Sequence, residues 1–128
     1  MLNLINRVVI LTIHLIPKFF IKFFANQYVA GITTKDALKT VKRLNDQGFA
    51  VTLDILGEHT NNKDKAELIT KQYCDILAEI NINNLDCNIS IKPSHIGSDI
   101  SNKLLMKNIK ILHETSMKNN NFIRIDME

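Results

Sequence analysis

The chain has 128 residues, of which 45% are hydrophobic and only 4 are Gly and 2 are Pro, a composition typical of a globular protein. This length allows one domain or part of one. Its 16 basic and 13 acidic residues leave a net charge of +3 without an arginine cluster, which argues against a nucleic-acid partner. The 4 histidines are scattered and the 2 cysteines show no ligand spacing, so no metal site is predicted.

Residues 1–25 are the most apolar part of the sequence, but Pro17 interrupts the run. A membrane-spanning helix needs roughly 20 apolar residues, whereas Pro17 suits the first turn of a second helix. We therefore predict a pair of helices packed on a larger domain. The alternatives are an interfacial membrane helix, with Lys18 and Lys22 at its rim, and a targeting segment.

One further helix is predicted before the first strand. A capping box at residues 33–36 indicates its start, and Gly48 is placed to end it. Its apolar face would consist of Ala37, Val41 and Leu44. Residues 1–47 are thus predicted to form N-terminal helices that precede a second region, residues 48–128.

Three short stretches of that second region share one design, a strand that ends in charged residues. They run from Val51 to Glu58, from Cys87 to Lys92 and from Ile123 to Glu128. Apolar and polar residues alternate in the last two, which indicates strands with one polar face. Gly57 is placed to turn the chain at the end of the first.

A helix-length pattern fills each interval between the strands. The first runs from about Lys63 to Ile80 and is capped by Asn61 or Asn62; the second begins after Ser101 and reaches about Lys118. Their predicted buried faces are Ala66, Ile69, Tyr73, Ile76 and Ile80 in the first helix and Leu105, Ile109 and Leu112 in the second. Residues 119–121, all Asn, break the second helix.

The spacing of the strands predicts an α/β fold. Lys92 follows Asp54 by 38 positions and Asp126 follows Lys92 by 34, each about one strand-helix-strand unit. Polar residues on one strand face favour a barrel over an open parallel sheet, whose strands are apolar throughout. A complete barrel of eight units needs about 250 residues. We therefore predict the N-terminal portion of a TIM-type (βα)8 barrel, present as a fragment; a small open α/β domain is the alternative.

Charged residues gather where the predicted strands end. In a parallel barrel the functional side chains project from the carboxyl ends of the strands, and these positions hold Asp54, Glu58, Lys92, Asp126 and Glu128. A lysine between carboxylates on strands about 4.8 Å apart would stay protonated and suit an anionic substrate group. Two alternatives are a ring of salt bridges that stiffens the barrel and a Schiff-base role for Lys92, which requires a neutral amine.

Several motifs, in order, resemble one enzyme family. They are Phe24-Ala-x-x-Tyr-Val-Ala-Gly31, Asp36-Ala37, Val51-Thr-Leu-Asp-Ile-Leu-Gly-Glu58, Ser90-Ile-Lys-Pro and Phe122-Ile-Arg-Ile-Asp-Met-Glu128. From about residue 19 to the end, the chain resembles the N-terminal half of bacterial monofunctional proline dehydrogenases. That resemblance implies a distorted FAD-binding barrel that oxidises L-proline to Δ1-pyrroline-5-carboxylate and passes electrons to a membrane quinone. It also implies a cytoplasmic protein, peripheral on the inner face of the membrane.

The resemblance also implies roles for individual residues. Lys92 would hold the proline carboxylate and Asp54 would orient Lys92, while Glu58 would pair with an arginine of the last barrel helix. Asp126 would lie beside the flavin, as a catalytic carboxylate together with Lys92, and the backbone at Met127 would touch the isoalloxazine ring.

The family's substrate arginines and most of its flavin-phosphate contacts belong to the second half of the barrel, which a continuation of the sequence or another chain would supply. Of the chain's own arginines, Arg7 and Arg43 lie in predicted helices, and Arg124 is predicted near the opposite end of its strand. We therefore expect the 128-residue chain alone neither to bind FAD tightly nor to oxidise proline. The remaining alternatives are a non-enzymatic module that associates with membranes through residues 1–25 and another barrel enzyme that uses Lys92 covalently.

Overall fold

The computed structural model describes residues 30–127. Contacts divide the chain into two units, residues 1–37 and residues 38–128. The paired N-terminal helices and the interfacial helix with Lys18 and Lys22, both predicted for residues 1–25, lie outside the described residues. Of the first unit, residues 30–37 are described, and they contain the start of helix α3 (Thr34–Asn45).

The remaining elements follow the predicted alternation of strand and helix. In chain order they are β1 (Val51–Leu53), α4 (Lys63–Ile82), β2 (Cys87–Ile91), the short 3-10 helix η1 (Pro93–His95), α5 (Asn102–Lys118) and β3 (Ile123–Ile125).

Side chains cap the three long helices at the positions that the sequence indicates. The Thr33 hydroxyl accepts from the backbone N–H of Asp36 at 3.2 Å and donates to the Asp36 carboxylate at 2.7 Å. Asn62 accepts from the N–H of Lys65 and opens α4, and Ser101 accepts from the N–H of Leu104 and opens α5. Such bonds satisfy helix N–H groups that have no partner within the helix, each contributing about 1 kcal/mol.

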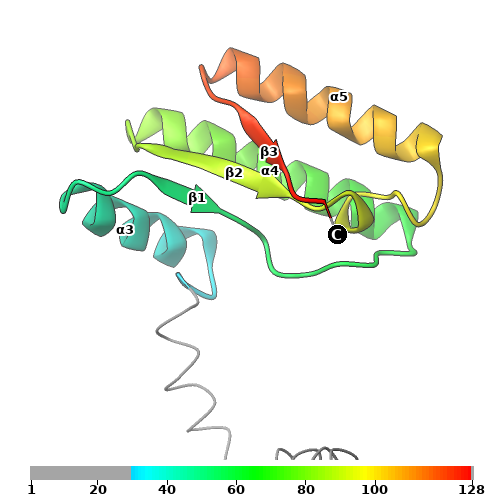
Figure 1. Cartoon of the computed structure of the whole chain (residues 1–128), viewed down its shortest axis with the longest axis horizontal. Helices are drawn as coiled ribbons and strands as arrows, with labels where there is room; N and C mark the ends of the chain where they lie inside the picture. The colour runs from blue at the N-terminus through cyan, green and yellow to red at the C-terminus, as the bar shows by residue number, and fades with distance from the viewer. Residues whose placement is uncertain (1–29, 128) are drawn as a thin grey trace, which may run out of the picture. The chain divides into compact units, whose positions relative to one another are not determined.

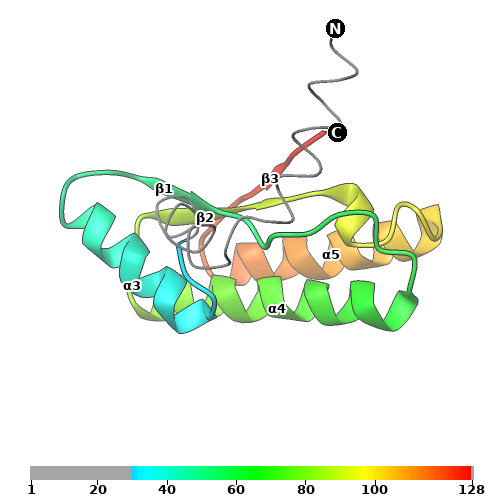
Figure 2. The same cartoon turned by 90° about the horizontal axis from the view of Figure 1, so that it is seen from below.

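The strands form one parallel sheet in the order β1-β2-β3 (Figure 1). Val51 lies opposite Cys87, and Ile91 lies opposite Ile125. Helices α4 and α5 cover the same face of this sheet (Figure 2). The predicted α/β class with three parallel strands alternating with helices is thus confirmed.

The core lies between the sheet and the helices. Along β2 the side chains of Cys87, Ile89 and Ile91 are buried, whereas the alternate residues Asn88 and Ser90 are only partly covered. All five residues of the predicted α4 face are buried, together with Thr70 and Leu77. Val41 of α3, Ile96 and Leu112 of α5 also belong to the buried hydrophobic cluster.

The structure differs from the sequence-based predictions in the details of the strands and of helix α5. Strands β1 and β3 each have three residues, and β1 ends at Leu53, although the sequence suggested a strand that reaches Glu58. In α5, Leu104 and Asn108 are buried with Leu112, whereas the predicted inward residues Leu105 and Ile109 are half-buried. The Asn108 side-chain amide, whose polarity alone would suggest a solvated position, donates to the carbonyl of Ile96 at 2.9 Å.

Candidate active site

The carboxyl ends of the three strands lie side by side because the sheet is parallel and in register. Asp54, Lys92 and Asp126 each come directly after the last residue of a strand. The backbone N–H of Asp126 donates to the carbonyl of Ile91 at 2.9 Å, so the ladder between β2 and β3 extends to this position. We call this edge the carboxyl end of the sheet, and the edge where the strands begin its amino end.

Lys92 and Glu58, two of the predicted site residues, form an ion pair. The ammonium Nζ of Lys92 lies 3.3 Å from the Oε2 of Glu58. The Lys92 side chain is 24% exposed and that of Glu58 is 55% exposed, so the pair is accessible from one side. This pairing supports binding of an anionic group and weakens the Schiff-base alternative, which needs a neutral amine.

Asp54 is joined to helix α4. Its carboxylate Oδ1 accepts a hydrogen bond of 2.8 Å from the phenolic hydroxyl of Tyr73. The same hydroxyl accepts from the backbone N–H of Ile55 at 3.2 Å. Burial, and next the bond to Asp54, raise the pKa of Tyr73 well above its ordinary value despite the opposing effect of the Ile55 N–H. Sequence periodicity assigned Tyr73 to the buried face and missed this role.

The loops beyond β1 and β2 are also joined to each other. The N–H of Thr60 donates to the carbonyl of Ser94 at 3.0 Å, and the Nδ1 of His59 lies 2.9 Å from the Oδ2 of Asp99. Hydrogen bonds from His59 and then Ser98 lower the pKa of the Asp99 carboxyl.

Gly57 lies directly against the buried imidazole of His95. A Cβ atom at Gly57 would come within 2.5 Å of the His95 Nε2, and the φ angle of Gly57 is +144°. Glycine is therefore required at this position for two reasons, close packing and backbone conformation. Glu58, the partner of Lys92, is the next residue, so this packing helps to fix where the loop delivers its carboxylate.

The end of β3 supplies the two residues predicted to lie near a flavin. Asp126 is exposed, and the Met127 side chain is 80% exposed. That Asp126 and the backbone at Met127 lie beside a flavin stays a prediction. Glu128 lies outside the described residues. Arg124 is the middle residue of β3, opposite Ser90 and two positions before Asp126, which corrects the prediction that it lies near the far end.

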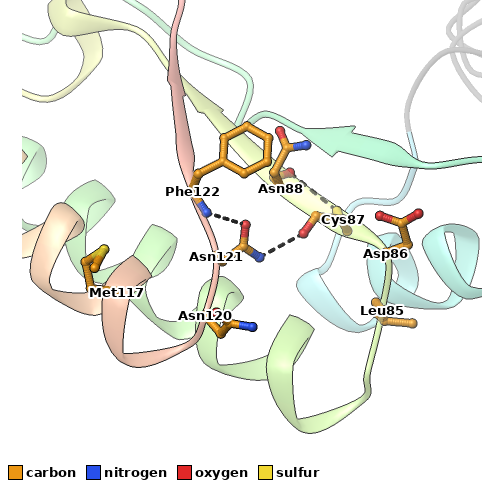
Figure 3. A pocket seen from close by; sticks show the side chains of 8 residues that line it. All are labelled: Leu85, Asp86, Cys87, Asn88, Met117, Asn120, Asn121 and Phe122. Carbon is orange, nitrogen blue, oxygen red and sulfur yellow. Dashed lines mark hydrogen bonds between the residues drawn. The ribbon is translucent and has the colours of Figure 1, made fainter.

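A separate pocket of about 420 Å³ lies at the amino end of the sheet (Figure 3). The Asn121 amide donates to the carbonyl of Cys87 at 2.8 Å across its floor. Burial raises the pKa of the Cys87 thiol to about 11, so this thiol is not an activated nucleophile. The predicted site residues are at the other end of the strands.

Two structural features are absent from residues 30–127. In that part of the chain, no three His, Cys, Asp or Glu side chains are grouped so that they could hold a metal ion. Within the same range, every helix is too short or too polar to span a membrane.

Known proteins resemble this chain in both sequence and fold. The family model for proline dehydrogenase matches residues 37–128. Proline dehydrogenase 1 of Bacillus subtilis subsp. natto is 33% identical over 104 residues, which are 81% of this chain and 34% of that protein. Proline dehydrogenase 2 of Bacillus subtilis (strain 168) is 31% identical over the same share of each. This chain thus spans about a third of the length of the curated relatives it matches.

The fold has a counterpart among solved structures. The crystal structure of proline utilization A (PutA) from Bdellovibrio bacteriovorus inactivated by N-propargylglycine matches with a TM-score of 0.70 at 20% identity, over 78% of this chain and 13% of that one. The three parallel strands and their helices therefore match part of a PutA proline dehydrogenase barrel, as the sequence predicted. On the sequence matches, the chain belongs to the proline dehydrogenase family.

Proposed function

We propose that residues 48–128 supply the first three strands and two helices of an FAD-dependent barrel that oxidises L-proline to Δ1-pyrroline-5-carboxylate. The ion pair of 3.3 Å between Lys92 and Glu58, at the carboxyl end of the sheet, is the observation that carries the proposal. It lies inside the segment that matches the family model, and the carboxyl ends of strands are where barrel enzymes place their active sites.

Lys92 would bind the carboxylate of proline. The last residue of β2 is buried, so the lysine stem leaves a rigid strand and its ammonium group is held within a small volume. An ammonium group binds an anion as a point charge with three donors. Glu58 holds that group in place and is itself more than half exposed, so it can turn to a second cation when substrate arrives.

Asp126 and Met127 would lie beside the flavin ring at the end of β3. Bound FAD would accept a hydride from the proline carbon next to nitrogen. The chain's own residues then have two tasks, to orient proline through its carboxylate and to shape the charge around the ring. By family resemblance, the remaining strands supply the arginines that complete the site.

Family resemblance also supports the proposed partners. They are L-proline, a quinone acceptor at the inner face of the membrane and the remaining strands of the barrel, with the protein on the cytoplasmic side. On this proposal the 128-residue chain by itself binds no stoichiometric flavin and does not oxidise proline.

A hybrid enzyme tests the proposal. The chain is fused to the part of Bacillus subtilis Proline dehydrogenase 1 that follows its matched segment, and proline-dependent dye reduction is measured beside the 128-residue chain alone. The hybrid is expected to be yellow and active. Lys92→Met should lower kcat/KM about 10- to 100-fold, the range for loss of a hydrogen bond to a charged group.

Lys110→Met is the matched control, because Lys110 also forms an ion pair, with Glu114 at 3.9 Å, but lies exposed on α5. Its kcat/KM should stay within about twofold of the parent, as for a surface ion pair. Equal losses in the two variants of an active hybrid would refute the role of Lys92.

A further inference from the structure

Tyr73 combines complete burial with a polar contact to the candidate active site. Its relative exposure is 0%, and its ring belongs to the main hydrophobic cluster. Its hydroxyl reaches from α4 to the end of β1, where it lies 2.8 Å from Asp54 Oδ1 and 3.2 Å from the backbone nitrogen of Ile55. One side chain therefore fixes both the backbone and the first charged group after β1.

The two bonds also determine the direction of the phenolic proton. A backbone N–H can only donate, so the bond from Ile55 occupies a lone pair of the hydroxyl oxygen. The phenol has one proton, and that proton must then point at Asp54. Because the pKa of Tyr73 is raised, the proton stays on the phenol across the neutral range. The Oδ1 of Asp54 consequently has a fixed hydrogen-bond donor, and this bond limits the orientations that the whole carboxylate can adopt.

The position of Asp54 explains why the hydrogen bond from Tyr73 is needed to orient its side chain. It is exposed and has left the sheet, so neither burial nor strand pairing restricts its side chain. Leu53 lies opposite Ile89 in the register, so Asp54 is level with Ser90, two residues before Lys92 on the adjacent strand. We propose that Tyr73 is a positioning residue for the active site, which holds Asp54 in one rotamer at the end of the strand next to that of Lys92, the lysine that would bind the substrate carboxylate.

This inference rests on the proposed function for its catalytic meaning, but its physical content is testable in the chain itself. The Asp54 χ1 rotamer is measured by NMR from three-bond couplings in the 128-residue chain. The parent is expected to show a single rotamer. Tyr73→Phe keeps the buried ring and removes only the hydroxyl, so Asp54 should become rotamer-averaged while the fold persists.

Thr70→Val is the matched control. Thr70 lies on the same helix, is also buried, and its hydroxyl donates to the carbonyl of Ala66 at 2.8 Å, away from Asp54. The variant loses a buried hydroxyl on α4 but should keep the single Asp54 rotamer. Averaging in the parent, an unchanged rotamer in Tyr73→Phe, or equal averaging in Thr70→Val would each overturn the proposal.

A second measurement uses the hybrid enzyme. Tyr73→Phe should raise the KM for proline about 2- to 10-fold, the range for one hydrogen bond, with a smaller change in kcat. In an Asp54→Asn background the same substitution should have no further effect on KM, because Tyr73 acts through the carboxylate. Additive effects would refute that coupling. An inactive hybrid would contradict the proposed function and leave the rotamer measurement decisive for Tyr73.

Discussion

The two ends of the sheet are built from different chemistry. At the amino end, neutral amides bond to backbone groups: the Asn45 side chain donates to the carbonyls of Phe49 and Asp86 and accepts from the N–H of Asp86. Asn121 similarly donates to the carbonyl of Cys87. At the carboxyl end, the side chains are charged, and Lys92 with Glu58 bonds side chain to side chain.

The two kinds of contact should contribute differently to the stability of the fold. A side-chain amide that satisfies backbone groups contributes about 1 kcal/mol per hydrogen bond. An accessible ion pair contributes about 0 to 1 kcal/mol. The Asn45 and Asn121 amides at the amino end should therefore stabilise the fold more than the ion pair of Lys92 and Glu58 at the carboxyl end does. Charged residues that lie together but contribute little to stability are candidates for binding and catalysis.

The largest expected effect is at Gly57. In Gly57→Ala, the new methyl group would clash with His95 and the backbone would be strained at φ +144°. Overpacking and strain each cost about 1–3 kcal/mol, so we expect the free energy of unfolding, measured with urea, to fall by about 2–6 kcal/mol.

Gly48 provides the control for Gly57. Its φ angle of +87° also favours glycine, but a Cβ atom there would meet nothing within 4 Å. Gly48→Ala should therefore cost only the backbone strain, about 1 kcal/mol. Equal costs at the two glycines would show that the contact with His95 is not a constraint on the loop that delivers Glu58.

The next effect concerns the amino end. Asn45→Ala removes three hydrogen bonds of 2.8–3.0 Å, so the free energy of unfolding should fall by about 2 kcal/mol, less than their sum because water replaces some of them. Asn121→Ala, which loses the bond to Cys87, should cost about half as much. Urea unfolding of both variants provides the measurement, and a cost at Asn45 no larger than at Asn121 would contradict the argument.

Lys92→Met provides the opposite test on stability. Because Lys92 and Glu58 are both accessible to water, its removal from the 128-residue chain should change the free energy of unfolding by less than about 1 kcal/mol. The same variant should lower the activity of the hybrid enzyme strongly. A loss of stability as large as that of Asn45→Ala would instead favour the salt-bridge ring that stiffens the barrel.

The sequence predicted what depends on local chemistry and missed what depends on tertiary contacts. Ser101 and Asn62 are caps because an oxygen near a helix start can bond only to groups a few residues away. The alternation along β2 requires only a sheet with one covered face. Asp54, the hydrogen-bond partner of Tyr73, is by contrast 19 residues away in the sequence. Helical periodicity predicts which side chains are buried, but not which group a buried hydroxyl contacts.

A signal for that contact was nevertheless present in the sequence. A tyrosine on a predicted buried face needs a partner for its hydroxyl, and Asp54 is an acceptor at the end of the preceding strand. The inward face of α5 was misjudged for a related reason: the buried Asn108 reads as polar until the carbonyl of Ile96 is placed against it. The roles of Lys92, Asp54, Glu58, Asp126 and Met127 in binding proline and flavin remain predictions.

The smallest expected effect tests how the two loops at the carboxyl end are held together. His59 and Ser98 lower the pKa of Asp99 in the folded chain, so the unfolded chain binds this proton more readily. The contribution of Asp99 to stability is therefore fully present above its unfolded pKa of about 3.9. It is lost as the pH falls through the lower folded value.

The unfolding free energies of the parent and of Asp99→Asn should accordingly differ most above about pH 5 and converge toward pH 2. His59→Asn isolates the cause, because Asn tolerates the φ angle of +50° at this position. In that background most of the pH dependence of the Asp99→Asn difference should vanish. If it persists, His59 is not the main source of the lowered pKa, and the contact of 2.9 Å between the loops contributes little to holding them together.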